Sequence, residues 1–176
     1  TVDMVLRRAM KGELDLMGPA MKVAGDLMSI PEIIEPSEAP LGNEEHMVGG
    51  FKKAILMVAG SAVQKLMQSL AKEQEVLMNI ADMAIWTYLA ESVYLRVQKK
   101  INSQGEEACA HDIAIAKTYF YDIADKIAKS AKDAINSYAE GDEARMMLMG
   151  LKRFTKTQPF NPKEARQLIA QKLIAD

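Results

Sequence analysis

The chain has 176 residues and carries 22 Lys and Arg against 24 Asp and Glu, a formal net charge of −2. A chain of this length buries about 70% of the surface that its unfolded form exposes, so one domain can form a sufficient core without a disulfide or a metal. The nearly balanced charge excludes the basic surface field of a typical nucleic-acid-binding protein. No nucleic-acid partner is therefore expected.

A single cysteine, Cys109, excludes an intramolecular disulfide and favours a reducing compartment, so we expect a cytoplasmic location. With only His111 nearby and no recognisable motif around it, Cys109 is predicted to be a buried, inert thiol. The longest apolar run, residues 54–60, falls far short of the roughly 18 to 20 residues of a spanning helix, and no transmembrane segment is predicted. The start at Thr1, without an initiator Met or a signal-peptide pattern, suggests a piece of a longer protein.

The first third of the chain is predicted to hold two helical segments and a linker. Residues 2–11 and 13–29 show helical patterns, interrupted near Gly12 and at Gly18 and Pro19. Apolar residues in the second segment recur at intervals of four, three and four, at Leu16, Ala20, Val23 and Leu27. Residues 30–45 contain three Pro and five Glu without Lys or Arg, so we predict an extended acidic linker of charge −5.

Three long helices are predicted next, at residues 51–70, 73–101 and 106–138, with a break at Gly105. The middle helix has two apolar stripes, one with Leu77, Ala81, Ala84, Tyr88 and Leu95 and one with Val76, Ile80, Met83, Tyr94 and Val97. Two stripes predict contacts on two sides of that helix. Asp122 with Lys126, and Asp125 with Lys129, are predicted ion pairs of a solvated face. The whole pattern predicts an all-α antiparallel bundle of about three long helices with shorter terminal helices.

Two shorter helices are predicted at the C-terminal end. Gly141 is placed for a left-handed turn, and residues 139–156 are predicted to close the bundle through Met146, Leu148, Met149 and Leu151, followed by a basic arm. The last helix is predicted to have Asn161 as N-cap, Pro162 as first residue, and an apolar face of Leu168, Ile169 and Leu173. Residues 150–176 carry a side-chain charge of +4, so we expect this tail to pack on the bundle or on the rest of its protein.

No residue is predicted to be catalytic, cofactor-binding or metal-binding. His46 and His111 are the only imidazoles, and neither has a second ligand at metal-binding spacing. The stretch "VGGFKK", residues 48–53, lacks the spacing and the preceding strand of a phosphate-binding loop. Four serines fall within predicted helices without a nucleophile elbow: Ser61, Ser69, Ser92 and Ser130.

Two residue groups leave alternatives open. The 13 Met residues either fill gaps in the core, which we favour, or line a soft groove for a partner helix. Trp86, Tyr88 and Tyr94 either anchor neighbouring helices, again the favoured interpretation, or stack on a ligand.

Four stretches of the chain carry a family resemblance: "MVLRRAMKGELDLMGPAM", "KKAILMVAGSAVQK", "EQEVLMNIADMAIWTYLAESVYLR" and "EGDEARMMLMGLKRFTK". They resemble the C-terminal portion of acyl-CoA dehydrogenases of the very-long-chain type, especially bacterial forms with an added helical extension. The resemblance implies that residues 1–29 are the last helices of the dehydrogenase α-domain, that 30–45 are a linker, and that 46–176 form the C-terminal bundle extension.

The resemblance also implies an activity for the full-length enzyme: FAD-dependent removal of two hydrogens from acyl-CoA in fatty-acid β-oxidation, with a glutamate base and a flavin hydride acceptor. The base and the flavin-contacting turn would lie upstream of Thr1, and "EGDE" at residues 140–143 is expected to be a helix junction. This chain would therefore bind no FAD and would serve assembly, with its own dehydrogenase chain and a second copy as partners in a homodimer.

Two further expectations concern partners. Membrane-contacting segments of long-chain relatives need basic amphipathic sequence, whereas residues 30–45 are acidic and proline-rich, so membrane binding is not expected here. The alternative function is a free-standing helical adaptor that binds an amphipathic partner helix in a Met-lined groove. The residues encoded immediately before Thr1 would distinguish the two functions.

Overall fold

The computed structural model describes residues 2–29 and 37–175. These residues form α1 (Val2–Met10), α2 (Met17–Met28), α3 (Gly42–Leu66), η1 (Met67–Lys72), α4 (Gln74–Gln104), η2 (Glu107–Cys109), α5 (Ala110–Tyr138), α6 (Gly141–Phe154) and α7 (Pro162–Ala175), where η marks a 3₁₀ helix. No strand occurs in the two described ranges, which confirms the predicted all-α class.

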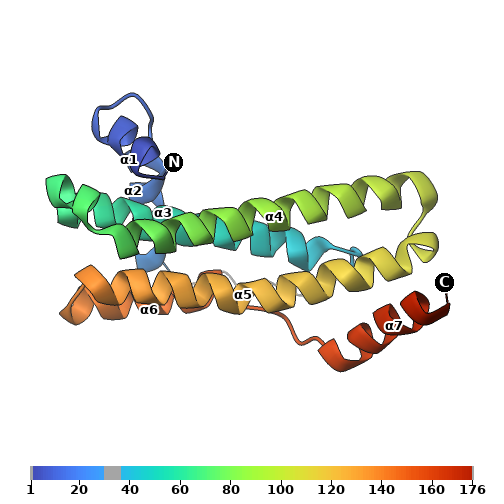
Figure 1. Ribbon diagram of the computed structural model, residues 1–176. Coiled ribbons are helices and arrows are strands. Elements are labelled where there is room, and N and C mark those ends of the chain that lie inside the picture. The colour runs from blue at the N-terminus through green and yellow to red at the C-terminus, as the bar shows by residue number, and fades with distance from the viewer. Residues whose placement is uncertain (1, 30–36, 176) are drawn as a thin grey trace.

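The three predicted long helices are confirmed as α3, α4 and α5, which run antiparallel along the length of the molecule (Figure 1). Each packs against both of the others, and the contact between α4 and α5 is the most extensive. The shorter α6 runs beside α3 and α5 and adds a fourth helix to one half of the bundle. Helix α2 packs on α3, and α7 packs on α5, so the tail lies on the bundle as expected.

The turns follow the local sequence signals. Gly105 ends α4 with φ +85°, and Gly141 separates α5 from α6 with φ +59°, which confirms the predicted left-handed position. Helix α7 begins at Pro162, and the Asn161 Oδ1 atom accepts a hydrogen bond from the Glu164 amide at 3.4 Å. Asn161 is therefore the N-cap of α7, as predicted.

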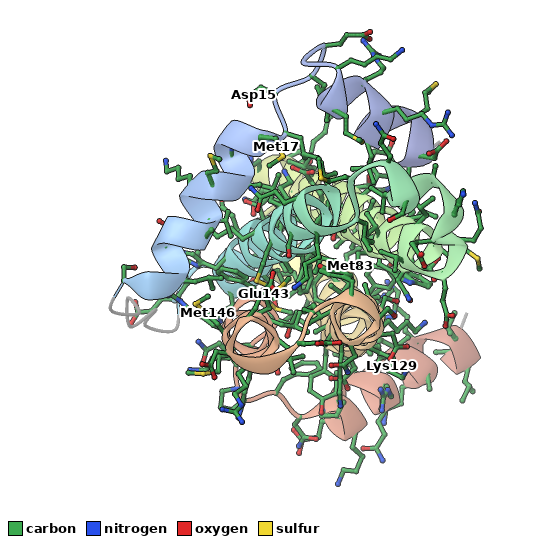
Figure 2. The ribbon with its side chains drawn as sticks, turned by 90° about the vertical axis from the view of Figure 1, so that its left-hand side faces the viewer. Asp15, Met17, Met83, Lys129, Glu143 and Met146 are labelled. Atoms are coloured by element: carbon green, nitrogen blue, oxygen red, sulfur yellow. The ribbon has the colours of Figure 1, made fainter. Side chains whose placement is uncertain are left out.

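One continuous core joins the N-terminal helices to the bundle. Its centre is a stacked pair of phenyl rings, Phe51 from α3 and Phe120 from α5, whose centroids are 6.4 Å apart. Figure 2 looks along the bundle and shows Met83 of α4 among the helices. Leu6 of α1 and Val23 of α2 belong to the same buried cluster. The assignment of residues 1–29 to a different domain remains a prediction.

The predicted linker, residues 30–45, is too long at its C-terminal end. Residues 30–36 lie outside the described ranges, but α3 already begins at Gly42, nine residues before the predicted start of the helix. From the sequence, Glu44 and Glu45 were assigned to the acidic linker. In the structure they occupy the first turn of α3, where the helix dipole favours negative charge.

The buried face of α6 also differs from the prediction. Met146 and Met149 are exposed, and only Leu151 of the predicted set is buried. The buried residues are Met147, Gly150, Leu151 and Phe154, at intervals of three, one and three. The expected closing of the bundle end is therefore wrong, because α6 lies lengthwise along α3 and α5 and presents a different stripe to them.

Three further surface details differ from expectation. Leu168 and Leu173 of α7 are exposed, and the small Ala165 is the buried residue that approaches α5. Asp122 pairs with Arg166 of α7, with a nitrogen to oxygen distance of 2.6 Å, and not with Lys126. Lys126 instead lies over the Trp86 ring, 4.4 Å from its centroid, and Lys129 pairs with Asp133. Contacts across helices thus replace the predicted pair of Asp122 with Lys126, whereas Lys129 pairs with a different residue of its own helix.

Among the described residues, the segment Gly42–Lys72 passes a length and composition test for a membrane-spanning helix, with mean hydropathy 1.2. A core helix of a soluble protein passes the same test, so this is weak evidence. Phe51, Ala54 and Val58 of this segment are fully buried in the bundle. The packing of the bundle thus accounts for the apolar character of α3.

Candidate functional site

The titratable groups singled out in the sequence do not form a common site. The His46 Nδ1 atom donates to the Gly42 carbonyl at 2.9 Å, within the first turn of α3. His111 lies at the start of α5, with its buried Nε2 atom unpartnered in the described chain. Cys109 is fully buried among apolar residues, as predicted. No group of three possible metal ligands comes together in the part of the chain that the structure describes.

Two of the four serines donate to a backbone carbonyl of the preceding helical turn. Ser69 donates to the Leu66 carbonyl at 2.6 Å and Ser92 to the Tyr88 carbonyl at 2.8 Å. Such bonds satisfy the hydroxyl locally and leave it unsuited to nucleophilic attack. Ser130 is half-buried on α5.

Ser61 belongs to a polar cluster where α3, α5 and α6 meet. Its hydroxyl lies 3.4 Å from Glu143 Oε1, while Lys65 Nζ lies 2.5 Å from Glu143 Oε2. The Tyr138 hydroxyl donates to the Val58 carbonyl at 3.0 Å, and burial raises the Tyr138 pKa to about 12. A tyrosine held neutral over the physiological range does not act as a base. The arrangement fastens α5 and α6 to α3.

The three aromatic residues of α4 differ in exposure. Trp86 is half-buried beneath Lys126, Tyr94 is half-buried, and Tyr88 is 70% exposed. Burial, and then the nearby Glu45 carboxylate, raise the Tyr94 pKa above its ordinary value. Trp86 and Tyr94 pack against the buried core, which supports the favoured anchoring interpretation for these two, whereas Tyr88 faces outward.

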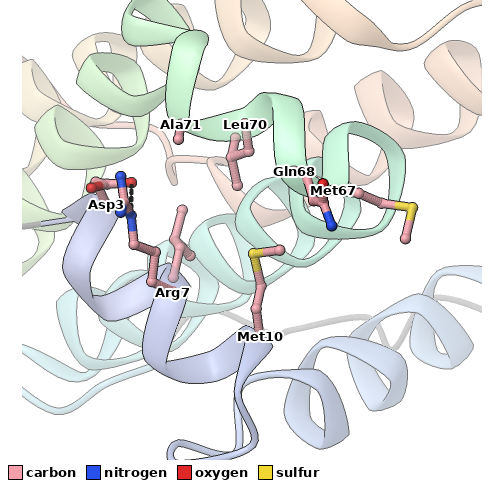
Figure 3. A pocket seen from close by; sticks show the side chains of 8 residues that line it. Asp3, Arg7, Met10, Met67, Gln68, Leu70 and Ala71 are labelled. Atoms are coloured by element: carbon pink, nitrogen blue, oxygen red, sulfur yellow. Dashed lines mark hydrogen bonds and ion pairs between the residues drawn. The ribbon is translucent and has the colours of Figure 1, made fainter.

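A shallow cavity of about 230 Å³ lies between α1 and η1 (Figure 3). Its apolar lining residues are Leu6, Met10, Met67, Leu70 and Ala71. The Arg7 guanidinium in this cavity is paired with Asp3 at 3.0 Å. Sites for drug-sized ligands measure roughly 300 to 1,000 Å³, so this cavity suits only a small group.

A second cavity, of about 80 Å³, contains the most unusual carboxyl group of the chain. Glu44 is only 7% exposed, and its Oε2 atom has no hydrogen-bond partner in the described chain. Burial raises the Glu44 pKa, partly opposed by a backbone hydrogen bond and by Lys117, which lines the same cavity. The folded chain therefore favours the protonated form of this group more than the unfolded chain does.

Replacing Glu44 by glutamine is expected to stabilise the fold at neutral pH by about 1 kcal/mol. Because the folded pKa lies above the unfolded value of 4.5, the free energy of unfolding falls as pH rises from below 4.5 through the folded pKa. Glu44→Gln removes this loss and flattens the profile in that window. Urea unfolding at several pH values measures both effects.

Glu45→Gln is the matched control, because Glu45 is exposed in the same turn of α3 and shares its helix dipole. It is expected to cost a few tenths of a kcal/mol. Equal destabilisation by both variants would mean that Glu44 is ionised in the folded protein.

The comparisons with known proteins place these features in a family. A model described as "Acyl-CoA dehydrogenase, C-terminal domain" matches residues 50–153, from α3 to α6. A probable acyl-CoA dehydrogenase of Bacillus subtilis is 36% identical over 157 residues, which are 89% of this chain and 26% of that protein. The chain belongs to the acyl-CoA dehydrogenase family. This confirms the family named from the four sequence stretches, although not the very-long-chain type.

An acyl-CoA dehydrogenase structure supports the same assignment. The crystal structure of the enzyme from Bacillus anthracis, complexed with FAD, superposes with a TM-score of 0.90 at 36% identity. It matches 99% of this chain, which spans 29% of that protein. This acyl-CoA dehydrogenase chain thus corresponds to between a quarter and a third of the relatives it matches.

The acyl-CoA dehydrogenase resemblance also singled out "EGDE", residues 140–143, as a helix junction. In the structure Glu140 is the extended residue before α6, and Asp142 and Glu143 lie in its first turn. Their carboxylates are favourably placed at the positive end of that helix. The motif therefore starts a helix, as expected.

Proposed function

We propose that this chain is the non-catalytic C-terminal helical domain of an FAD-dependent acyl-CoA dehydrogenase of the very-long-chain type. The whole enzyme would act in the cytoplasm on acyl-CoA in fatty-acid β-oxidation. One observation carries the proposal: 99% of the chain superposes on an acyl-CoA dehydrogenase complexed with FAD, at 36% identity. The chain itself would contribute to assembly of the enzyme.

The polar groups of the chain support a structural role. Lys65 and Glu143 link α3 to α6, Lys52 and Glu91 link α3 to α4 at 2.6 Å, and Arg166 and Asp122 link α7 to α5. These contacts lie at helix seams and not in a shared cavity. The two cavities, of about 230 and 80 Å³, are too small for an acyl-CoA molecule.

The small cavities also weigh against the adaptor alternative. A groove for a partner helix needs a long apolar channel, whereas the larger cavity has only Met10 and Met67 among its lining residues as candidates for a Met-lined groove. The favoured core-filling interpretation holds for Met47, Met57, Met83 and Met147, which are buried. It does not hold for seven exposed Met residues: Met4, Met10, Met21, Met67, Met78, Met146 and Met149.

The purified chain is expected to be colourless and inactive. Absorbance between 350 and 500 nm after incubation with about stoichiometric FAD would measure flavin binding, and a dye-reduction assay with acyl-CoA would measure oxidation. Neither signal should exceed that of a protein-free control. A polypeptide that contains this chain joined to a complete dehydrogenase body should give both signals.

Stoichiometric flavin in the isolated chain, or turnover of acyl-CoA by it, would contradict the proposed non-catalytic role.

A further inference from the structure

The outward face of α4 is an apolar surface that nothing in the described chain covers. Helix α4 packs on α3 and α5, and α7 lies on the far side of α5 (Figure 1). Five large apolar residues on the free side are 40% to 70% exposed: Met78, Ile85, Tyr88, Leu89 and Leu95. Single exposed apolar residues are ordinary, but a row of them along one helix marks an interaction surface. We call it the α4 face.

The spacing of the α4 face is that of a helix-pairing surface. Met78, Ala81, Ile85, Tyr88, Ser92 and Leu95 follow one another at alternating intervals of three and four residues. This is the a and d pattern with which one helix packs lengthwise against another. The buried side of α4, with Val76, Ile80 and Met83, already serves the bundle. Because α3 and α5 already provide the two contacts expected from the sequence, the α4 face is a further side of the helix that the described chain leaves uncovered.

Charge on the same face identifies that helix. Acidic Glu75 and Asp82 lie at the N-terminal end of the exposed side, and basic Arg96 and Lys99 lie at the C-terminal end. None of these four residues makes an ion pair within the described chain. A second α4 in antiparallel orientation places acids against bases at both ends, whereas a parallel one places like charges together. The face is thus complementary to itself across a twofold axis.

We propose that the α4 face is the contact between two copies of this chain, paired antiparallel about a twofold axis near Tyr88. Such an isologous contact uses every favourable interaction twice. The inference rests on the assembly role proposed above, and it identifies the α4 face as the surface that serves this role. One pair of helices buries less than the roughly 1,600 Å² of a standard interface, so we expect dissociation in the micromolar range.

Sedimentation velocity of the full chain over a wide concentration range tests the contact. The wild type should dimerise reversibly, and Ile85→Lys should remain monomeric with an unchanged circular dichroism spectrum. Met149→Lys is the control, because Met149 is 75% exposed on α6, away from the α4 face, and the dimer should survive it. A monomeric wild type, or an Ile85→Lys dimer of wild-type affinity, would overturn the proposal.

A charge exchange tests the orientation. Asp82→Arg and Arg96→Asp each place like charges opposite one another twice, so each variant should dimerise at least about tenfold more weakly. Mixed in equal amounts, the two variants should form a heterodimer of near wild-type affinity, because every Arg then faces an Asp. If the mixture dimerises as weakly as the single variants, the antiparallel arrangement is excluded.

The dimerisation experiments and the flavin assay separate the two proposals. A flavin-free, inactive chain that stays monomeric would leave the proposed domain function standing and end the α4 proposal. A chain that binds FAD and dimerises would contradict the proposed non-catalytic function and leave the α4 proposal standing.

Discussion

Replacing Gly50 by alanine is expected to destabilise the fold by about 3 kcal/mol. A Cβ atom at Gly50 would approach the carbonyl oxygen of Phe154 closer than 3.0 Å, and that oxygen belongs to the backbone at the end of α6. A flexible side chain could move aside at small cost, but a backbone atom moves only with its helix. The substitution therefore pushes α6 away from α3.

The neighbouring Gly49 provides the matched control. It lies in the same helix, is exposed, and has nothing within 4 Å of a Cβ atom at its position. Alanine there should stabilise the fold by about 1 kcal/mol, because glycine is a poor helix former. Urea unfolding of both variants measures the difference. Equal effects of the two substitutions would show that α6 does not approach α3 as closely as described.

The Gly49 and Gly50 pair illustrates what sequence could not supply. In the sequence the two glycines were considered only as part of a possible phosphate-binding loop, which was rejected. The neighbouring residues do not indicate which of the two glycines tolerates a side chain. The difference comes from α6, about a hundred residues later in the chain, whose last residue Phe154 approaches α3 at Gly50. A close approach between backbones depends on helix crossing and leaves no periodic signal in either helix.

The helices themselves were predictable, because their apolar spacing, glycine breaks and caps are local. Gly105, Gly141 and the Asn161 cap all ended or began helices where expected. The start of α3 was missed because acidic residues suit both an extended linker and a first helical turn. The choice between them depends on tertiary packing, in which the apolar neighbours Leu41, Met47 and Val48 are buried.

The surface of α4 was partly predictable in the same sense. Two apolar stripes indicated two contacts, but only the structure shows which stripe the bundle covers. Tyr88 and Leu95 were assigned to one stripe in the sequence and are exposed, while the other stripe is mostly buried. The α4 face therefore consists of the apolar residues of α4 that remain exposed once the helix has packed against the bundle.

Removing either ring of the central aromatic pair is expected to have the largest effect on stability. Phe51 and Phe120 are both fully buried, and their rings stack with an interplanar angle of 20°. Alanine at Phe120 deletes a ring from the centre of a close-packed core and should cost about 4 kcal/mol. Phe160 is only half-buried and tilts against Tyr121 at 5.7 Å, so Phe160→Ala should cost about 1 kcal/mol and serves as the control.

Measuring the contribution of ring stacking requires milder substitutions. Two alanine substitutions together would remove most of the roughly 5 to 15 kcal/mol by which a typical domain is stable. Phe51→Leu and Phe120→Leu each keep much of the volume and should cost about 1.5 kcal/mol. The double variant should cost about 1 kcal/mol less than the sum of the two, since the first substitution already removes the ring pair. Thermal and urea unfolding of the four proteins give this coupling energy. Strict additivity would mean that the two rings stabilise α3 and α5 only by filling space, with no contribution from their mutual orientation.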